Sequence, residues 1–509
     1  MIRLIRRLIW LLPAEDRLLA GGVVALIALL AFAEAILHPM LLKLLMDEAA
    51  RAEDFRRFIA LGILYLVISI ALVFSFYGAL LLRRALINRV LLHVEMQIFE
   101  NIQGLDIREF RKGGTGYYVS RLHKDTMEGL APAIAFVSEA ARNLLAIVAF
   151  VGVLLWLSWK ATLLLFLVVP PVVALANHIG SRIRRVTELE RESEARYLDV
   201  LTRALEALPF VRSFSSLLPR VEKIVAGRLK AYLDYGYKNL YLSVLQQGAN
   251  DLTMNFATIL AMIVAGYYLF IREFTFGGFM AFTNTFWRAV TSIFNFFKQL
   301  PEAQRYDQIL HRLEELLTPP PKPYYHLADE ARLENVEVEL EGKKALDVPR
   351  FEVRSGEHVL LAGPNGAGKT TLLYVLAGLL APDKGKVWRP ERVVSVTLPL
   401  ALPPLRVEEI VEDHALLEAL GLASYAKERA SDLSAGERQK VAIAAALTRD
   451  ADLYLLDEPL ANVDEATKPI IIELIHKRLE GKSLVTIMHG EKNFQEGFDR
   501  TFELGRANG

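Results

Sequence analysis

The sequence predicts a chain of two parts, an all-α bundle that spans a membrane and an α/β domain with a parallel sheet. Hydrophobic residues make up 53% of the 509 residues, which is above the usual share in soluble proteins. Six long apolar segments precede residue 300, and short apolar strands alternate with helices after about residue 327. The length is sufficient for two or three domains.

The first helix is expected to lie on the inner face of the membrane. Within residues 1–17, Arg3, Arg6 and Arg7 interleave with Leu and Ile at helical spacing. A signal peptide is the alternative, but no small-residue cleavage site follows and the long apolar segment begins only after Arg17. The pattern favours an amphipathic interfacial helix.

Residues 18–318 are predicted to form the transmembrane domain, with six segments near the roughly 20 residues that a membrane-spanning helix needs. The spans are expected near residues 18–45, 58–83, 133–157, 161–184, 248–271 and 277–300. The last two carry several Asn and Gln residues and Arg288. Such polar groups favour helices that face one another or a water-filled cavity.

The charges of the connectors predict the topology. The connectors over residues 84–132 and 185–247 are long and rich in Lys and Arg, whereas those after the third and fifth spans are short. The N-terminus and both long connectors are therefore expected inside. Their apolar residues recur at helical spacing among many charges, which predicts helices that continue out of the membrane.

Prolines mark the boundary between the two parts. Four of the five residues after Thr318 are proline, which removes backbone donors and disfavours helix in the preceding residue. Residues 319–327 are interpreted as a linker and residues 328–509 as the second domain.

A complete G-x-x-x-x-G-K-[ST] phosphate loop lies between a predicted strand, 358–362, and a predicted helix, 371–377. Chance would produce this pattern in roughly one or two chains per hundred of this length, and the alternative is a glycine-rich turn. Backbone N–H groups would cradle phosphates, Lys369 would reach the β and γ oxygens, and Thr370 would hold Mg²⁺. The predicted nucleotide-binding residues here are Gly363, Pro364, Asn365, Gly366, Ala367, Gly368, Lys369, Thr370 and Thr371.

An acidic pair follows the apolar run 453–456. Asp457 is predicted to bind Mg²⁺ and Glu458 to polarise an attacking water. The carboxyl end of a parallel strand is where an open α/β sheet presents such groups. Without the phosphate loop, a solvated strand end would be an equally good interpretation.

Three further elements complete an ordered set of motifs. They are Leu433-Ser434-Ala435-Gly436-Glu437, Asn462-Val463-Asp464, and His489 after the run 484–488. Together with the phosphate loop, the acidic strand and six preceding spans, this order resembles the half-size ABC exporters. The resemblance implies a six-span transmembrane helical bundle with long intracellular helices, followed by an α/β P-loop ABC ATPase domain.

The resemblance also implies a dimer with two composite ATP sites. Ser434 and the amides around Gly436 would meet the γ-phosphate bound by a second subunit, and Asp464 would link the two sites. Glu458, His489 and Lys369 would be the catalytic residues. Residues 110–116 and 120–125 are similar to the family's first coupling region, and residues 206–214 are similar to its second. The expected location is the cytoplasmic (inner) membrane, with the ATPase domain in the cytoplasm.

Four positions depart from the family pattern. Leu340 stands where the family has an aromatic residue, and Ala435 stands where it has glycine. Leu398 and Glu437 stand where it has glutamine. Tyr324 or Tyr325 is the alternative contact for adenine, with packing as the favoured role for both. The departures suggest unequal ATP sites and favour a heterodimer over a homodimer, which stays open.

The leading functional hypothesis is ATP-driven export or flipping of a substrate by alternating access. The alternatives are a regulatory subunit that binds ATP with low turnover, which Glu458 argues against, and an ATP-gated pore. Glu34, His38 and Arg288 either line the substrate pathway or pair with neighbouring helices. Balanced totals of 59 basic and 59 acidic residues give no support for a nucleic-acid partner.

Overall fold

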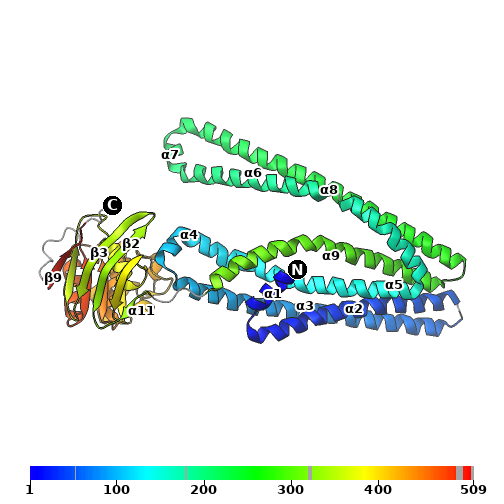
Figure 1. The fold of residues 1–509 in the computed structure, drawn as a ribbon, viewed down its shortest axis with the longest axis horizontal. Helices are drawn as coiled ribbons and strands as arrows, with labels where there is room; N and C mark the ends of the chain where they lie inside the picture. The colour runs from blue at the N-terminus through cyan, green and yellow to red at the C-terminus, as the bar shows by residue number, and fades with distance from the viewer. Residues whose placement is uncertain (52, 178–179, 319–323, 489–496, 506–509) are drawn as a thin grey trace. The chain divides into compact units, whose positions relative to one another are not determined.

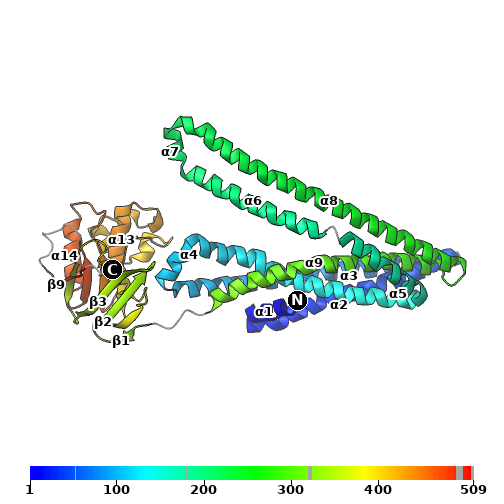
Figure 2. The ribbon, with the colours of Figure 1, turned by 45° about the horizontal axis from the view of Figure 1, so that its top comes forward.

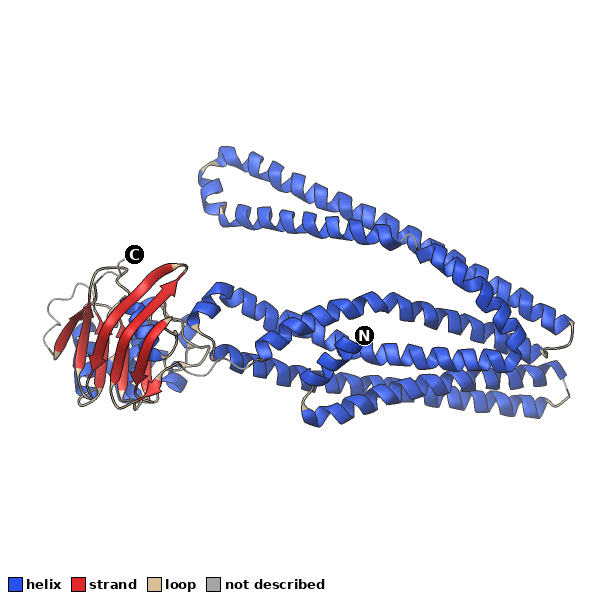
Figure 3. Ribbon diagram, viewed as in Figure 1, coloured by secondary structure: helices blue, strands red, loops and turns tan. Residues whose placement is uncertain are grey.

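The structure is a computed structural model that describes residues 1–51, 53–177, 180–318, 324–488 and 497–505. It divides into two compact units. One consists of Met1–Glu95 with His123–Glu314, and the other of Met96–Leu122 with Glu315–Gly509. Among the described residues the first unit is helical and the second holds all the strands (Figure 3).

Helices, most of them long, make up the first unit (Figure 1). Their bounds are α1 Ile2–Leu11, α2 Ala14–Arg51, α3 Phe55–Gln103, α5 Ala131–Asn177, α6 Gly180–Glu206, α7 Leu208–Ser213, α8 Leu218–Phe270 and α9 Phe276–Leu317. A π-helical segment, Ser120–Leu130, leads into α5. Helix α3 continues into the second unit at Met96.

Helix α1 is amphipathic as predicted, but its leucines face the protein. Leu4, Leu8 and Leu11 are buried, and Arg7 donates to the carbonyl of Asp307 at 2.9 Å. On its other side Ile2, Ile9 and Trp10 are exposed. That this exposed side lies on the inner face of the membrane stays a prediction.

The helices of the first unit pack through small residues. One cluster joins α2, α5, α8 and α9 through alanines such as Ala35, Ala149 and Ala261, around the fully buried ring of Phe282. Small side chains let helix backbones approach closely, which stabilises helix association where lipid removes the hydrophobic driving force.

Helices cover all six predicted spans where residues are described. The third predicted span and residues 161–177 of the fourth lie in one helix, α5, which is interrupted at Ser158 (φ −163°, ψ 108°) in the predicted short connector. Residues 180–184 of the fourth span belong to α6. By length and composition, four stretches among the described residues could cross a membrane: Ala14–Arg51, Phe55–Gln103, Ile107–Phe166 and Leu218–Phe270. The count of six spans therefore stays a prediction.

The second long connector forms a helical hairpin. Helices α6 and α8 lie side by side, with α7 at the tip (Figures 1 and 2). The rings of Tyr197 and Tyr232 stack between the two helices, with their centroids 6.3 Å apart. Continuous helix in this connector agrees with its predicted periodicity.

A five-stranded parallel sheet forms the centre of the second unit, in the order β6-β7-β8-β4-β9. These strands are β4 His358–Ala362, β6 Val393–Val396, β7 Leu453–Asp457, β8 Ser483–Ile487 and β9 Arg500–Glu503. Strands β7 and β8 are buried along their whole length. Burial on both faces explains their near-continuous apolar sequences.

A second sheet and several helices cover the parallel sheet. The second sheet has the order β1-β5-β2-β3. Its strands are β1 His326–Leu327, β2 Ala331–Leu340, β3 Lys343–Val353 and β5 Lys384–Arg389. The helices are α10 Lys369–Ala377, α11 Val407–Ile410, α12 His414–Ala419, α13 Ala435–Thr448 and α14 Lys468–Arg478. Helix α4, Ile107–Val119, also belongs to this unit.

Candidate nucleotide site and its connections

The phosphate loop joins β4 to α10 as the motif predicts. Gly368 precedes the helix in a left-handed conformation (φ 94°), where a Cβ would lie 2.4 Å from the carbonyl oxygen of Ala345. A Cβ on Gly363 would lie equally close to the carbonyl of Leu504. Only glycine fits at these two positions, so the residues of the motif are required by the path of the backbone.

Lys369 is poised in the loop without an acidic partner. Its side chain is 7% exposed, and Nζ donates to the carbonyls of Gly363 at 2.8 Å and Pro364 at 3.1 Å. Among the described residues no carboxylate forms an ion pair with it. A buried ammonium held only by carbonyl oxygens suits an anionic ligand, which would supply the missing charge.

The structure brings the loop and the acidic pair together around one cavity of 510 Å³. Its lining includes Asn365, Gly366, Gly368, Lys369, Thr370, Thr371, Asp457 and Glu458. Gly366 has φ 81° with open space beside it, so backbone groups can face a ligand there. A hydroxyl and two carboxylates beside a phosphate-binding loop are the oxygen donors that Mg²⁺ prefers, so the residues fit an ATP–Mg²⁺ complex.

Gln439 is a residue of this site that sequence reasoning missed. It lies in α13, is 1% exposed, and its Nε2 donates to the carbonyls of Glu458 at 3.2 Å and Pro459 at 3.3 Å. Glu458 has an unusual positive φ of 45°. Gln439 therefore fixes the backbone that presents the predicted base. Its one signal is a polar residue at a position of α13 that faces the core.

Ser434 caps α13 in a reciprocal arrangement with Glu437. The Ser434 N–H donates to Oε2 of Glu437 at 2.8 Å, and the Glu437 N–H donates to the Ser434 hydroxyl at 3.4 Å. The Ser434 and Tyr425 hydroxyls hold the pKa of Glu437 below its ordinary value. The glutamate that departs from the family pattern thus has a structural role as the third residue of a capping box.

Gly436 and Asp464 tie this helix to the segment after β7. A Cβ on Gly436 would lie 2.5 Å from the carbonyl oxygen of Asn462. Asp464 pairs with Lys440 at 2.7 Å and accepts from the N–H and hydroxyl of Thr467. These hydrogen bonds and the ion pair hold the pKa of Asp464 far below its usual range.

Ser434 and Gly436 do not line the 510 Å³ cavity that holds the loop. This separation agrees with their predicted contact to a nucleotide of another subunit. His489 lies outside the described residues, so its predicted contact with phosphate is untested.

One of the departures and both linker tyrosines have packing roles. Leu340 packs against the core of the second unit, as do Tyr324 and Tyr325. Tyr324 donates to the carbonyl of Val375 at 3.0 Å, and Arg389 lies 4.0 Å from the ring centroid of Tyr325. The favoured packing role for both tyrosines agrees with these contacts.

Helix α4, from the first long connector, docks on the α/β domain through its first turn. Asp106 caps the helix by accepting from Arg108 N at 2.7 Å and also accepts from Ala381 N at 2.9 Å. Arg108 donates to both carboxylate oxygens of Asp383, at 2.9 and 3.0 Å. Ile107 packs against the core of the domain. These docking residues precede the coupling region predicted from residue 110.

The Arg108–Asp383 pair stays ionised in its partly buried setting. Burial alone would raise the pKa of the Asp383 carboxyl, but hydrogen bonds from the Glu339 N–H and from Arg108 outweigh burial and hold it below its ordinary value. The pair therefore persists throughout the neutral pH range.

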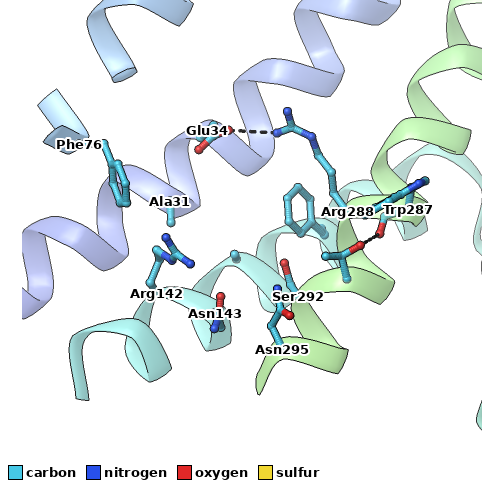
Figure 4. Close-up of a pocket in the computed structure, with 12 residues that line it drawn as sticks. Ala31, Glu34, Phe76, Arg142, Asn143, Trp287, Arg288, Ser292 and Asn295 are labelled. Carbon is cyan, nitrogen blue, oxygen red and sulfur yellow. Dashed lines mark hydrogen bonds and ion pairs between the residues drawn. The ribbon is translucent and has the colours of Figure 1, made fainter. Parts of the chain in front are cut away.

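A second cavity, of 260 Å³, lies within the helical unit between α2, α3, α5 and α9 (Figure 4). Glu34 and Arg288 pair across it at 3.1 Å. Asn143 lines it at 4% exposure, and its Nδ2 has no hydrogen-bond partner within the described chain. Phe76 and Trp287 add aromatic surface. His38 is absent from this lining and bonds to Tyr65.

Comparison with known proteins shows the family to which this architecture belongs. Residues 22–292 match the ABC transporter transmembrane region, and residues 346–461 match the ABC transporter domain. The first match covers more than half of the chain. The chain belongs to the ABC transporter family. Membership confirms the predicted resemblance, the membrane-embedded helical part and the ATP-binding α/β domain that follows it in the same chain.

Individual relatives resemble different portions of this ABC transporter. The zinc import ATP-binding protein ZnuC of Pseudomonas syringae pv. syringae is 41% identical over 158 residues, and that of Pseudomonas savastanoi pv. phaseolicola is 42% identical over 158. Each match covers 28% of this chain, which spans 60% of the length of these relatives. The ATP-dependent lipid A-core flippase of Bordetella pertussis is 23% identical over 453 residues, 79% of this chain and 71% of that protein.

Proposed function

We propose that this chain is one half of a dimeric ABC exporter that uses ATP to move or flip a substrate across the cytoplasmic membrane. The observation that carries the proposal is the docking of α4, a helix of the membrane part's own connector, on the domain that holds the phosphate loop. A direct connection of this kind suits coupling of nucleotide binding to movement of helices. The similarity to a lipid A-core flippase, which covers 79% of this chain, supports the same function.

The roles of the nucleotide site follow from its geometry. Lys369 and the loop amides would bind the phosphates, while Thr370 and Asp457 would hold Mg²⁺, which neutralises charge on the transferred phosphoryl group. Glu458, fixed by Gln439, would orient the attacking water. His489 is proposed as a further phosphate contact from its place in the motif order.

Two surfaces support a partner subunit. Ser434 and Gly436 lie outside the lining of their own loop's cavity, so they are free to complete the site of another half-transporter. At the hairpin tip, Phe210 and Phe214 are 60% and 52% exposed, with ring centroids 4.7 Å apart. We propose that a second half-transporter covers this aromatic tip, and that the partner is a different chain because the departures in the signature make the sites unequal.

The cavity in the helical unit is the proposed part of the substrate route. Its lining combines aromatic rings with the Glu34–Arg288 pair and the unpartnered amide of Asn143. That combination suits an amphipathic substrate, because apolar and polar groups both find partners there. Glu34 and Arg288 would change partners as the cavity opens.

The test is reconstitution of the full chain in liposomes, alone and with a co-purifying half-transporter, with ATPase activity measured across classes of amphipathic compounds. Glu458→Gln should lower turnover by about 10²–10⁴-fold while ATP binding is retained. Stimulation of the parent by one class would support export. A regulatory ATP-binding subunit would show low activity that Glu458→Gln leaves nearly unchanged, and absence of ATPase with every partner would defeat the proposal.

A further inference from the structure

The hydroxyl of Tyr374 connects α4 with the segment that follows β6. Arg111, in α4, donates from Nη2 to the hydroxyl oxygen at 2.9 Å, and the hydroxyl donates to the carbonyl of Leu398 at 2.8 Å. The Arg111 guanidinium also lies 5.2 Å from the centroid of the tyrosine ring. All three residues belong to the second unit.

Leu398 lies beside the acidic edge of the parallel sheet. It follows the end of β6 by two residues, and β6 pairs with β7, the strand that ends in Asp457. The Leu398 side chain has no atom that can bind Mg²⁺ or water. What this position offers to its surroundings is therefore its backbone carbonyl, which Tyr374 holds.

The hydroxyl has a use that packing alone does not explain. The Tyr374 side chain is 5% exposed, and a phenylalanine would fill the same space. The hydroxyl instead accepts from one segment and donates to another, neither of them its own helix. Because α10 begins at Lys369, the same helix also carries the phosphate-binding end of the site.

We propose that Tyr374 is the positioning residue through which α4 and the nucleotide site sense each other, in place of a side-chain contact by a glutamine at position 398. A displacement of α4 would move Arg111, weaken its bond to the hydroxyl, and release the Leu398 carbonyl beside the acidic strand. The inference rests on the proposed function, because it concerns how nucleotide binding reaches the helices.

The experiment uses the full chain in lipid nanodiscs in the Glu458→Gln background, with ATP and Mg²⁺ as the probe. Hydrogen exchange is followed in two places: residues 363–377 report nucleotide binding, and residues 107–119 report the response of α4. We expect ATP to protect the loop equally with and without Tyr374→Phe. The ATP-dependent change in hydrogen exchange of residues 107–119 should be about fivefold smaller in Tyr374→Phe than in the parent. The loss of one hydrogen bond shifts an equilibrium by about this factor.

Tyr324→Phe is the matched control, since its hydroxyl also bonds to a backbone carbonyl, that of Val375 in α10. It should leave the α4 response unchanged, whereas Arg111→Met should reduce it as Tyr374→Phe does. An unchanged α4 response in Tyr374→Phe, or an equal loss in Tyr324→Phe, overturns the proposal. Absence of ATP protection at the loop in the parent instead defeats the proposed function itself, and the inference with it.

Discussion

At the scale of single residues, the departures from the family pattern at positions 435 and 437 flank Gly436, which the local packing requires to be glycine. Its missing side chain admits the Asn462 carbonyl, whereas Ala435 is exposed and Glu437 completes a capping box. The signature can therefore change on either side of this glycine without loss of the local fold.

Gly436→Ala should destabilise the α/β domain because its Cβ would lie 2.5 Å from a backbone oxygen. Overpacking of this kind costs about 1–3 kcal/mol, and each kcal/mol lowers the unfolding temperature of a domain this size by about 2–4 °C. Calorimetry of the full chain would measure the shift. Gly227→Ala, in a helix with open space beside the glycine, is the control and should not lower the unfolding temperature. Equal melting of Gly436→Ala and the parent would refute the close approach.

Glu437→Gln should keep the cap and tighten ATP binding in the composite site. A glutamine oxygen can still accept the Ser434 N–H, while loss of one negative charge near the nucleotide is worth about 0.5–1 kcal/mol, or a factor of roughly 2–5 in affinity. Nucleotide titration of the dimer checks this. Glu437→Ala should instead lose about 1 kcal/mol of stability through the cap. Weaker ATP binding by Glu437→Gln would contradict the inference that the negative charge of Glu437 lowers the affinity for ATP.

The pH dependence of this cap has a defined sign. The pKa of Glu437 is lowered in the folded state, mainly by the Ser434 hydroxyl, so its contribution to stability is complete above the ordinary value of 4.5. That contribution should disappear only as pH falls through the lowered pKa. Melting of Glu437→Gln and the parent should therefore differ by a constant amount between pH 6 and pH 8 and converge in acid.

At the scale of elements, the phosphate loop, the acidic strand and the helical connectors could be predicted because each has a local signal. A glycine pattern fixes the loop, apolar runs fix buried strands, and helical spacing fixes α6 and α8. The partners of α4 could not be predicted, because Asp106, Arg108 and Asp383 are ordinary surface residues until the fold brings them together. Gln439 could not be predicted for the same reason, because its role depends on hydrogen bonds to two carbonyls of another segment.

Docking of α4 should depend on Asp106 more than on neighbouring acids. Asp106→Ala removes both the helix cap and the bond to Ala381 N, and loss of a cap alone costs about 0.5–2 kcal/mol. Hydrogen exchange in residues 107–119 should become faster by about tenfold. Glu109→Ala, in the same turn, should leave exchange unchanged. Equal effects of the two substitutions would contradict specific docking through Asp106.

At the scale of the whole molecule, the proposed dimer would use this chain for parts of two different ATP sites. The loop with its acidic pair and the signature with its cap are separate surfaces of the same domain. Fold class and family could be predicted from the sequence because the motifs occur in a fixed order. The identity of the partner could not, because interface residues carry no local pattern of their own.

The purified chain should associate weakly with itself if its partner is a different half-transporter. We expect sedimentation of Glu458→Gln with ATP to show a mainly monomeric species, and dimers to form after addition of a co-purifying half-transporter. Phe210→Ser at the exposed tip should weaken that dimer, whereas the exposed Leu233→Ser on the shaft of α8 should not. A stable, hydrolytically active dimer of the single chain would refute the heterodimer.

The close approach of Gly436 to Asn462 also sets a limit on how this sequence can evolve. Substitutions at position 435, and those at position 437 that can still accept the Ser434 N–H, keep the local fold and can tune nucleotide affinity from either side. Position 436 can change only if the segment after β7 moves at the same time, and that segment includes Asp464. In a library of single variants, position 436 should therefore be the least tolerant of the three, and its rare rescues should map to residues 460–464.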